Sequence, residues 1–261
     1  MARVLVVADL HLDQWKHAGL DPLDRLSRDE WAGLDGVIVA GDLANDPLRK
    51  WPRHLSALAR RIAPARIHVV PGNHDYYGLG IDGDAVLARL CAEQGVGFAQ
   101  MAAVAIAGRP FLCTTLWTAP GRRDAMLAHD LRRIPGPGGR ALRPADLVAC
   151  HRRQAEWLAS GLAGAGGRAV VVTHHVPEPR LLAPGAAGAG GHAARMGALI
   201  ARHPPRAWLF GHAHDAPGGR IAGVACVNVA LGPPPAPAPA GGAEAVLAAA
   251  GARLRALIRS F

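Results

Sequence analysis

Five short runs of apolar residues are each followed by aspartate, asparagine or histidine. In chain order they are VVADLH from residue 6, VIVAGD from residue 37, VVPGNHD from residue 69, VVVTHH from residue 170 and WLFGHAH from residue 208. Runs of this length and composition are typical of buried β-strands. The carboxyl ends of parallel strands share one edge of a sheet, so the five polar ends are expected to meet there. A single polar residue at a strand end is usually structural, whereas five in one chain indicate a site.

The spacing of these and the other apolar runs predicts the fold. In the N-terminal half, β-type runs alternate with a longer stretch of helical periodicity, which is typical of parallel strands joined by crossover helices. Three further short runs between residues 96 and 115 are expected to form an antiparallel meander. The expected strands are 3–8, 36–40, 66–71, 169–173, 207–210 and 221–229, and the expected helices are 48–62 and 147–162. Together these elements predict two sheets packed face to face with helices outside.

Segments without this regularity divide the chain. Residues 1–231 are expected to form one domain, 232–242 a Pro/Gly-rich linker, and 243–261 an amphipathic C-terminal helix that docks on its own domain or on a second copy of the chain. Within the domain, residues 119–144 and 176–191 are rich in glycine and proline. Irregular segments of this length in a compact domain are usually functional, so substrate selection is expected to depend on them.

The donor types at the strand ends indicate a metal centre. Imidazole, carboxylate and amide oxygen without thiolate favour Mn, Fe or Zn, of which Mn is the expectation here. The donors are too many for one ion and suit two ions that share a carboxylate: Asp9, His11, Asp42, Asn73, His174, His212 and His214. Two ions roughly 3.5–4 Å apart can hold both the attacking and the leaving oxygen in a displacement at phosphorus.

The ordered motifs D-x-H, G-D, G-N-H-D, a central H and G-H-x-H resemble those of the calcineurin-like metallophosphoesterase superfamily. The resemblance extends from Val4 to about Val229, which is most of the chain. It implies a four-layer α/β/β/α sandwich with two central mixed sheets. It also implies a metal-dependent phosphoric ester hydrolase in which a hydroxide that bridges the two metals attacks the phosphorus.

The resemblance assigns the donors to two metal positions. The first would be held by Asp9, His11 and His214, and the second by Asn73, His174 and His212, with Asp42 bridging both. The family pattern favours the first histidine of the THH motif as the ligand. The GHAH motif has Ala213 where relatives often have threonine, and this change leaves both flanking histidines in place.

The remaining motif residues are assigned to catalysis and substrate binding. By resemblance, His74 would donate a proton to the leaving oxygen, and Asp75 would orient its imidazole. His175 is expected to line the phosphate pocket. Tyr76 and Tyr77 are expected either to stack on an organic leaving group or to pack within the fold, and Arg132 or Arg133 to contact a substrate phosphate. The segment that contains Arg132 also carries His129 and Asp130, and it has two interpretations, a solvated basic loop or a cover over the site.

Three functions are compatible with these motifs. The first is hydrolysis of a small phosphomonoester or phosphodiester. The second is a nuclease, since ADLHL resembles the opening motif of recombination-repair nucleases and the net charge of +9 would favour binding to nucleic acid. Against it, the chain lacks the aromatic–basic alternation of single-strand binders. The third is a non-catalytic scaffold, against which the complete ligand set and His74 argue.

The chain has no recognisable export or membrane signal. Its first residues lack the apolar core and cleavage site of a signal peptide, and the uncharged stretch from Ile221 to Ala243 contains five prolines. The four cysteines are scattered without a C-x-x-C pair, as in proteins of a reducing compartment. A cytoplasmic protein without a transmembrane segment is therefore expected.

Overall fold

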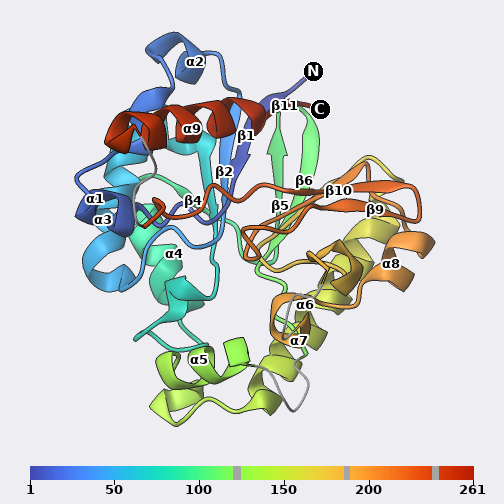
Figure 1. The fold of residues 1–261 in the computed structure, drawn as a ribbon. Helices are drawn as coiled ribbons and strands as arrows, with labels where there is room; N and C mark the ends of the chain where they lie inside the picture. The colour runs from blue at the N-terminus through green and yellow to red at the C-terminus, as the bar shows by residue number, and fades with distance from the viewer. Residues whose placement is uncertain (120–124, 185–188, 237–240) are drawn as a thin grey trace.

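A computed structural model describes residues 1–119, 125–184, 189–236 and 241–261, with the side chains of 125–128 and 189–190 left out of the description. Its strands form two sheets (Figure 1). The first sheet has the order β11-β1-β2-β3-β4, with β1 Arg3–Val7, β2 Gly36–Ala40, β3 Ile67–Val70, β4 Gly97–Phe98 and β11 Ile258–Ser260. The second has the order β5-β6-β7-β8-β10-β9, with β5 Ala102–Ile106, β6 Arg109–Thr114, β7 Val170–Thr173, β8 Ala207–Phe210, β9 Gly219–Ile221 and β10 Val224–Asn228.

The central strands are buried on both faces, as parallel strands in α/β proteins usually are. Parallel pairing joins β1 to β2, β2 to β3 and β3 to β4 in the first sheet, and β6 to β7, β7 to β8 and β8 to β10 in the second. Val170, Val172 and Leu209 of the second sheet lie in the same apolar cluster as the strands of the first. The two sheets therefore pack face to face, as the sequence predicts.

Helices cover the outer face of each sheet. On the first lie α3 Pro47–Ala59, α4 Asp84–Glu93 and α9 Gly242–Ala256, and on the second lie α6 Pro144–Ala165 and α8 Gly197–Arg202 (Figure 1). In α3, for example, Trp51, Leu55 and Leu58 follow at helical spacing and are all buried. The expected four-layer α/β/β/α sandwich is confirmed.

The expected antiparallel meander between residues 96 and 115 is wrong in its first run. Strand β4 pairs in parallel with β3 in the first sheet, whereas β5 and β6 form an antiparallel hairpin in the second. The chain changes sheets just after β4, where Met101 has a left-handed φ of 48°. Alternation of apolar residues alone did not reveal this change of sheet.

The C-terminal segment also differs from the expected helix over 243–261. Helix α9 ends at Ala256, and β11 then pairs antiparallel with β1. This strand covers an edge of the first sheet whose N–H and C=O groups would otherwise lack partners. Leu254 and Leu257 are buried within the chain's own core, and the Phe261 ring packs edge-on against Phe111.

The linker runs close to the N-terminal part of the chain. The indole N–H of Trp15, on α1 Leu12–His17, donates to the carbonyl oxygen of Gly232 at 3.0 Å.

No helix in the described part of the chain is long and apolar enough to cross a bilayer.

Candidate metal centre

The ends of strands from both sheets meet at one edge. The N–H of Asp9, after β1, donates to the carbonyl oxygen of Gly41, after β2, at 2.9 Å. In the second sheet, the N–H of Gly211 after β8 donates to the carbonyl oxygen of His174 after β7. A parallel bridge between Ala8 and Ala230 joins the two sheets at this edge. The sequence prediction that these polar ends converge is therefore confirmed.

Four of the predicted ligands have left-handed backbone conformations, with φ of 54° at Asp9, 42° at His11, 57° at Asp42 and 67° at His212. For residues other than glycine this conformation costs roughly 1–3 kcal/mol and persists only where the surroundings impose it. Such conformations are concentrated at functional sites. Here they turn the side chains at the strand ends toward one another.

Glycines give these side chains the space to approach. A Cβ atom at Gly41 would collide with the His174 ring, and one at Gly72 would collide with the Asp42 carboxylate. A Cβ at Gly211 would collide with Asp9. The glycines of the AGD, PGN and FGH motifs are therefore required by close packing around the donors.

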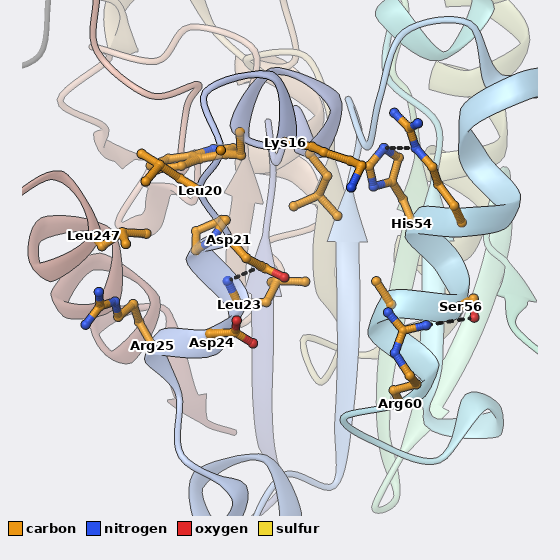
Figure 2. A pocket seen from close by; sticks show the side chains of 16 residues that line it. Lys16, Leu20, Asp21, Leu23, Asp24, Arg25, His54, Ser56, Arg60 and Leu247 are labelled. Atoms are coloured by element: carbon orange, nitrogen blue, oxygen red, sulfur yellow. Dashed lines mark hydrogen bonds between the residues drawn. The ribbon is translucent and has the colours of Figure 1, made fainter. Parts of the chain in front are cut away.

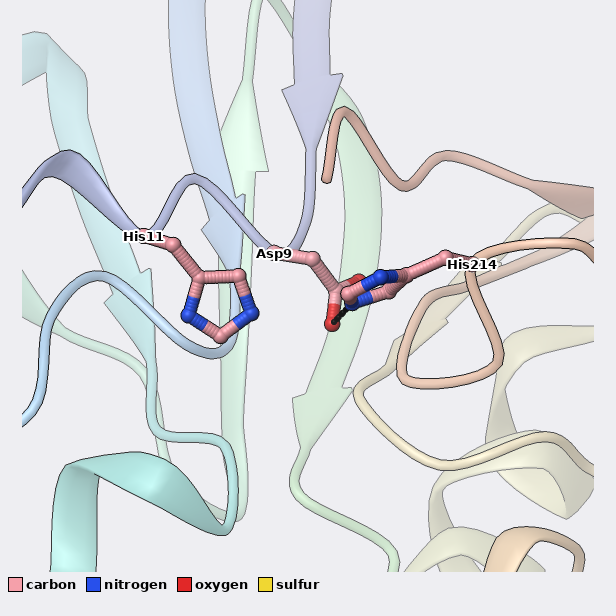
Figure 3. A group of neighbouring side chains, drawn as sticks. All are labelled: Asp9, His11 and His214. Carbon is pink, nitrogen blue, oxygen red and sulfur yellow. Dashed lines mark hydrogen bonds and ion pairs between the residues drawn. The ribbon is translucent and has the colours of Figure 1, made fainter. Parts of the chain in front are cut away.

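The first group of donors consists of Asp9, His11 and His214 (Figure 3). Each offers one ligand atom, and these atoms lie within 4.8 Å of one another. His214 Nε2 lies 3.2 Å from Asp9 Oδ1. Burial acts to raise the pKa of Asp9, but the hydrogen bond from His214 and the nearby imidazoles outweigh it and lower the pKa to about 2. Asp9 is thus a buried carboxylate in its charged form.

The second group contains acceptors that face one another. Burial lowers the pKa of His174, so its ring is neutral and carries one N–H. Nδ1 lies 3.1 Å from the carbonyl oxygen of Ala40 and donates there. The Nε2 lone pair then faces Asn73 Oδ1 at 3.0 Å and Asp42 Oδ1 at 3.5 Å. The imidazole lone pair and the amide oxygen share no proton and repel one another, and a cation between them would remove this repulsion.

Asp42 lies between the two groups. One of its oxygens is 3.7 Å from His11 Nε2, and the other is the oxygen that faces His174. Burial, followed by the carboxylates of Asp9 and Asp75, raises the pKa of Asp42 well above its usual value. Buried carboxylates this close together are stabilised by positive charge, so the donor set fits bound cations.

His212 completes the second group. Its Nδ1 lies 3.1 Å from the same oxygen of Asn73, and burial lowers the pKa of its ring well below the usual value. The other ring nitrogen, Nε2, is buried without a hydrogen-bond partner in the described part of the chain. The amide oxygen of Asn73 is thus a point at which two imidazoles converge.

The His74 imidazole is oriented by a different residue from the one predicted. Its Nδ1 lies 2.8 Å from Asn45 Oδ1, whereas the Asp75 carboxylate accepts the backbone N–H groups of Gly72 and Asp42 and the indole N–H of Trp51. Asp75 therefore braces the loops after β2 and β3, and the expectation that it orients His74 is wrong. A carboxylate next to a histidine in sequence points elsewhere because the chain turns sharply at 74–76.

The two tyrosines after His74 lie in different surroundings. Tyr76 is fully buried, and its hydroxyl group bonds to Asp84, so the expected stacking of Tyr76 on a leaving group is wrong. Tyr77 instead packs on the His74 ring with 4.4 Å between the centroids. The sequence alone did not distinguish adjacent tyrosines in an irregular turn.

The other two predicted substrate contacts have different outcomes. His175 is buried with Nδ1 3.3 Å from the carbonyl oxygen of Thr115, and its ring lies 4.3 Å from the His212 ring. It therefore lies behind His212 and does not line the cavity, contrary to the expectation. Arg132 lies exposed on α5 Ala125–Arg133, and its contact with substrate stays a prediction.

A cavity of about 350 Å³ opens over the donors, lined by His11, Asp42, His74, His212 and His214 among others. His192, at the end of α7 Ala189–His192, also lines it, and its ring lies 4.9 Å from the His212 ring. His192 was not predicted because no strand precedes it. The signal that could have found it is its position immediately after the irregular segment 176–191, which was expected to be functional.

The described part of the chain has two larger cavities. One of about 880 Å³ lies between α1, α3, α9 and the short turn Pro22–Arg25 (Figure 2), and one of about 700 Å³ adjoins it through Lys16, Leu20 and Arg53. Within the described ranges, every group of three metal-ligating side chains lies at the strand ends. The smaller cavity is therefore the candidate active site.

A sandwich of two mixed sheets with an Asp–His–Asn cluster at its strand ends defines a metal-dependent hydrolase of phosphoric esters. The chain belongs to the calcineurin-like phosphoesterase family, whose sequence model matches residues 2–216.

Solved structures with a similar fold include the phosphopantetheinyl hydrolase PptH from Mycobacterium tuberculosis. It has a TM-score of 0.62 and 20% sequence identity to this chain, and the match covers 88% of this chain and 89% of PptH. A Staphylococcus aureus protein provisionally assigned as a 5′-nucleotidase, in complex with α-ketoglutarate, has a TM-score of 0.47 and 14% identity over 87% of this chain and 48% of its own. At these identities the likeness concerns the fold alone. No curated protein sequence matches the chain.

Proposed function

We propose that this protein hydrolyses a small phosphomonoester or phosphodiester with two divalent cations bound at the strand ends. The observation that carries the proposal is the group of side chains around Asn73 Oδ1, where this oxygen and His174 Nε2 face one another as two acceptors because His174 donates from Nδ1 to Ala40. This group lies next to the Asp9, His11 and His214 group, and both border a cavity large enough for a phosphate and part of its substituent.

The two groups suit one cation each. Asp9, His11 and His214 would hold the first, Asn73, His174 and His212 the second, and Asp42 would be shared. Nitrogen and oxygen donors without thiolate support Mn, Fe or Zn, and Mn is the metal that we propose to test first. When bound, such ions would polarise the phosphoryl group and make the attacking water more acidic.

His74 is the proposed proton donor to the leaving oxygen. Its Nδ1 is hydrogen-bonded to Asn45 Oδ1, so Nε2 is the nitrogen that can exchange a proton with a substrate in the cavity. Burial, with the nearby imidazoles of His11 and His174, lowers the pKa of His74 to about 3. A bound phosphate would add negative charge beside the ring and thereby favour its protonated form.

Metal removal and reloading would test this function. The purified chain is stripped with a chelator, reloaded with Mn²⁺, and assayed on p-nitrophenyl phosphate and bis-p-nitrophenyl phosphate. We expect two Mn²⁺ per chain and hydrolysis that depends on Mn²⁺, with the preferred ester separating monoesterase from diesterase. Lack of hydrolysis of any phosphoester despite two bound ions would overturn the proposal, and cleavage of linear DNA instead would favour the nuclease.

A further inference from the structure

A carboxylate outside the family motifs reaches the second group of donors. Asp130 lies on α5, in the segment that the sequence left as either a basic loop or a cover, and its side chain is only 7% exposed. Its Oδ1 accepts a hydrogen bond from Asn73 Nδ2 at 3.0 Å and another from the Tyr77 hydroxyl group at 2.8 Å. The cover interpretation therefore fits the described part of this segment.

The contact decides which way the Asn73 amide points. An amide has an acceptor oxygen and a donor nitrogen at nearly equivalent positions, and only its partners determine the orientation. With the NH₂ group on Asp130, Oδ1 faces His174 Nε2 and His212 Nδ1. If the amide were turned over, its NH₂ could donate to the His174 lone pair, and the group would then need no cation.

Asp130 opposes this turned orientation. Asp130 Oδ1 accepts both of its hydrogen bonds, so the turned amide would place its own oxygen against another buried acceptor oxygen. A neutral partner with both a donor and an acceptor would tolerate both orientations of the Asn73 amide. An acceptor-only partner tolerates one, and this is the orientation that directs the amide oxygen to the proposed second cation.

The helix that carries Asp130 is fixed to the loop that carries Asn73. The N–H of Gly78 donates to the carbonyl oxygen of Arg133 at 3.0 Å, and that of Ile81 donates to the carbonyl oxygen of Pro135 at 2.9 Å. The Arg133 guanidinium also lies over the Tyr77 ring, 5.7 Å from its centroid. The position of the carboxylate is therefore held by several contacts that do not involve the metal ligands.

We infer that Asp130 is a positioning residue that keeps the Asn73 amide oxygen turned toward the second cation. The inference rests on the proposed function, because it concerns the affinity of one of the two proposed metal positions. Substitution of a residue that hydrogen-bonds a metal ligand usually lowers metal affinity or activity by 10–100-fold. Among the proposed ligands, Asp130 hydrogen-bonds Asn73, which belongs to the second metal position. Its substitution should therefore change the affinity of that position and leave the affinity of the first position nearly unchanged.

Calorimetric titration of the metal-free full-length chain with Mn²⁺ tests this inference. Asp130→Asn keeps the shape of the side chain but permits both amide orientations, and Asp130→Leu removes the acceptor. In both variants we expect one of the two Mn²⁺ affinities to fall by about tenfold or more, while the other changes by less than about threefold. Electron paramagnetic resonance at two equivalents should show less of the exchange-coupled Mn²⁺ pair and more isolated Mn²⁺.

Asp82→Asn is the matched control. Its carboxylate accepts the N–H of Gly138 at 3.1 Å and bonds to no proposed ligand. We expect this variant to bind two Mn²⁺ with the affinities of the wild type.

Two outcomes would count against the inference, and each is distinguishable from failure of the proposed function. Unchanged affinities in both Asp130 variants would overturn it. Equal loss at both positions in a folded Asp130→Asn variant would indicate a general structural role and would also overturn it. If Asp130→Leu fails to fold, the isosteric Asp130→Asn variant decides alone. Wild-type protein that binds no second Mn²⁺ would contradict the proposed function itself.

Discussion

The strand-end loops and the helix α5 place side chains in the same cluster by different physical means. The loops continue from strands that are buried on both faces, and their ligands are held by left-handed backbone conformations that glycines make room for. Helix α5 contributes mainly through one buried carboxylate and the Tyr77 that it bonds. The first region thus supplies the donors, and the second controls how one of them points.

Because of this difference, we expect substitutions in the two regions to affect metal binding in different ways. A change in a strand-end donor removes a ligand, whereas a change in the region of α5 alters the orientation of a ligand that is still present. Variants in the two regions test that distinction, and their expected effects decrease from Asp42 to the two tyrosines.

Asp42→Asn should have the largest effect. It removes charge from the carboxylate that faces both donor groups, and bound cations contribute several kcal/mol to the transition state of such reactions. We expect kcat/KM to fall by more than about 1000-fold and the bound Mn²⁺ to fall below two per chain. Asp46→Asn, a nearby half-buried acid, is the control. Two tightly bound Mn²⁺ in Asp42→Asn would contradict the shared position of this residue.

His74→Asn should separate catalysis from metal binding. Loss of a positioned proton donor commonly costs about 100- to 10,000-fold in rate. We expect kcat to fall by about 100- to 1000-fold on an ester with a poor leaving group, while the bound Mn²⁺ stays at two per chain. The fall in kcat should be smaller on an ester whose leaving group needs no proton. Equal losses on both esters would argue against His74 as the proton donor.

Asn45→Ala tests the partner that the structure assigns to the His74 imidazole. Without Asn45 Oδ1 the ring loses its bond at Nδ1, and we expect kcat to fall by about tenfold with little change in metal affinity. Asp46→Asn alters a nearby carboxylate that pairs with Arg49 and should change kcat by less than about twofold. If Asn45→Ala has the kcat of the wild type, the orientation of His74 is set by other contacts.

Substitution of the two adjacent tyrosines should have the smallest effects. We expect one to change stability and the other to change Mn²⁺ affinity. Tyr76→Phe removes a buried hydroxyl group that bonds to Asp84 and Gln100, and we expect the free energy of unfolding to fall by about 1–3 kcal/mol with Mn²⁺ affinity unchanged. Tyr77→Phe removes one of the two hydrogen bonds to Asp130, so we expect it to weaken the second Mn²⁺ by only a few-fold. Denaturant titration and calorimetry measure the two effects. The reverse pattern would show that Tyr76 faces the site.

The sequence was informative wherever chemistry follows a regular element. Asp9, Asp42 and His174 each come directly after a buried apolar strand, and such ends meet for a simple geometric reason. The same regularity predicted the two sheets and the helices outside them. Prediction was wrong at the irregular turns, where Asp75 points to backbone N–H groups and Tyr76 points into the core.

The amino-acid sequence by itself therefore determined the layered fold, the family and the types of donor at the strand ends. These properties depend on periodicity and on residue type, which can be read without coordinates. The tertiary structure alone decided that Asn45 orients His74, that His192 lines the cavity and that Asp130 faces the Asn73 amide. Each of these contacts joins segments far apart in the chain or beyond a sharp turn, and their distances depend on how the whole chain packs.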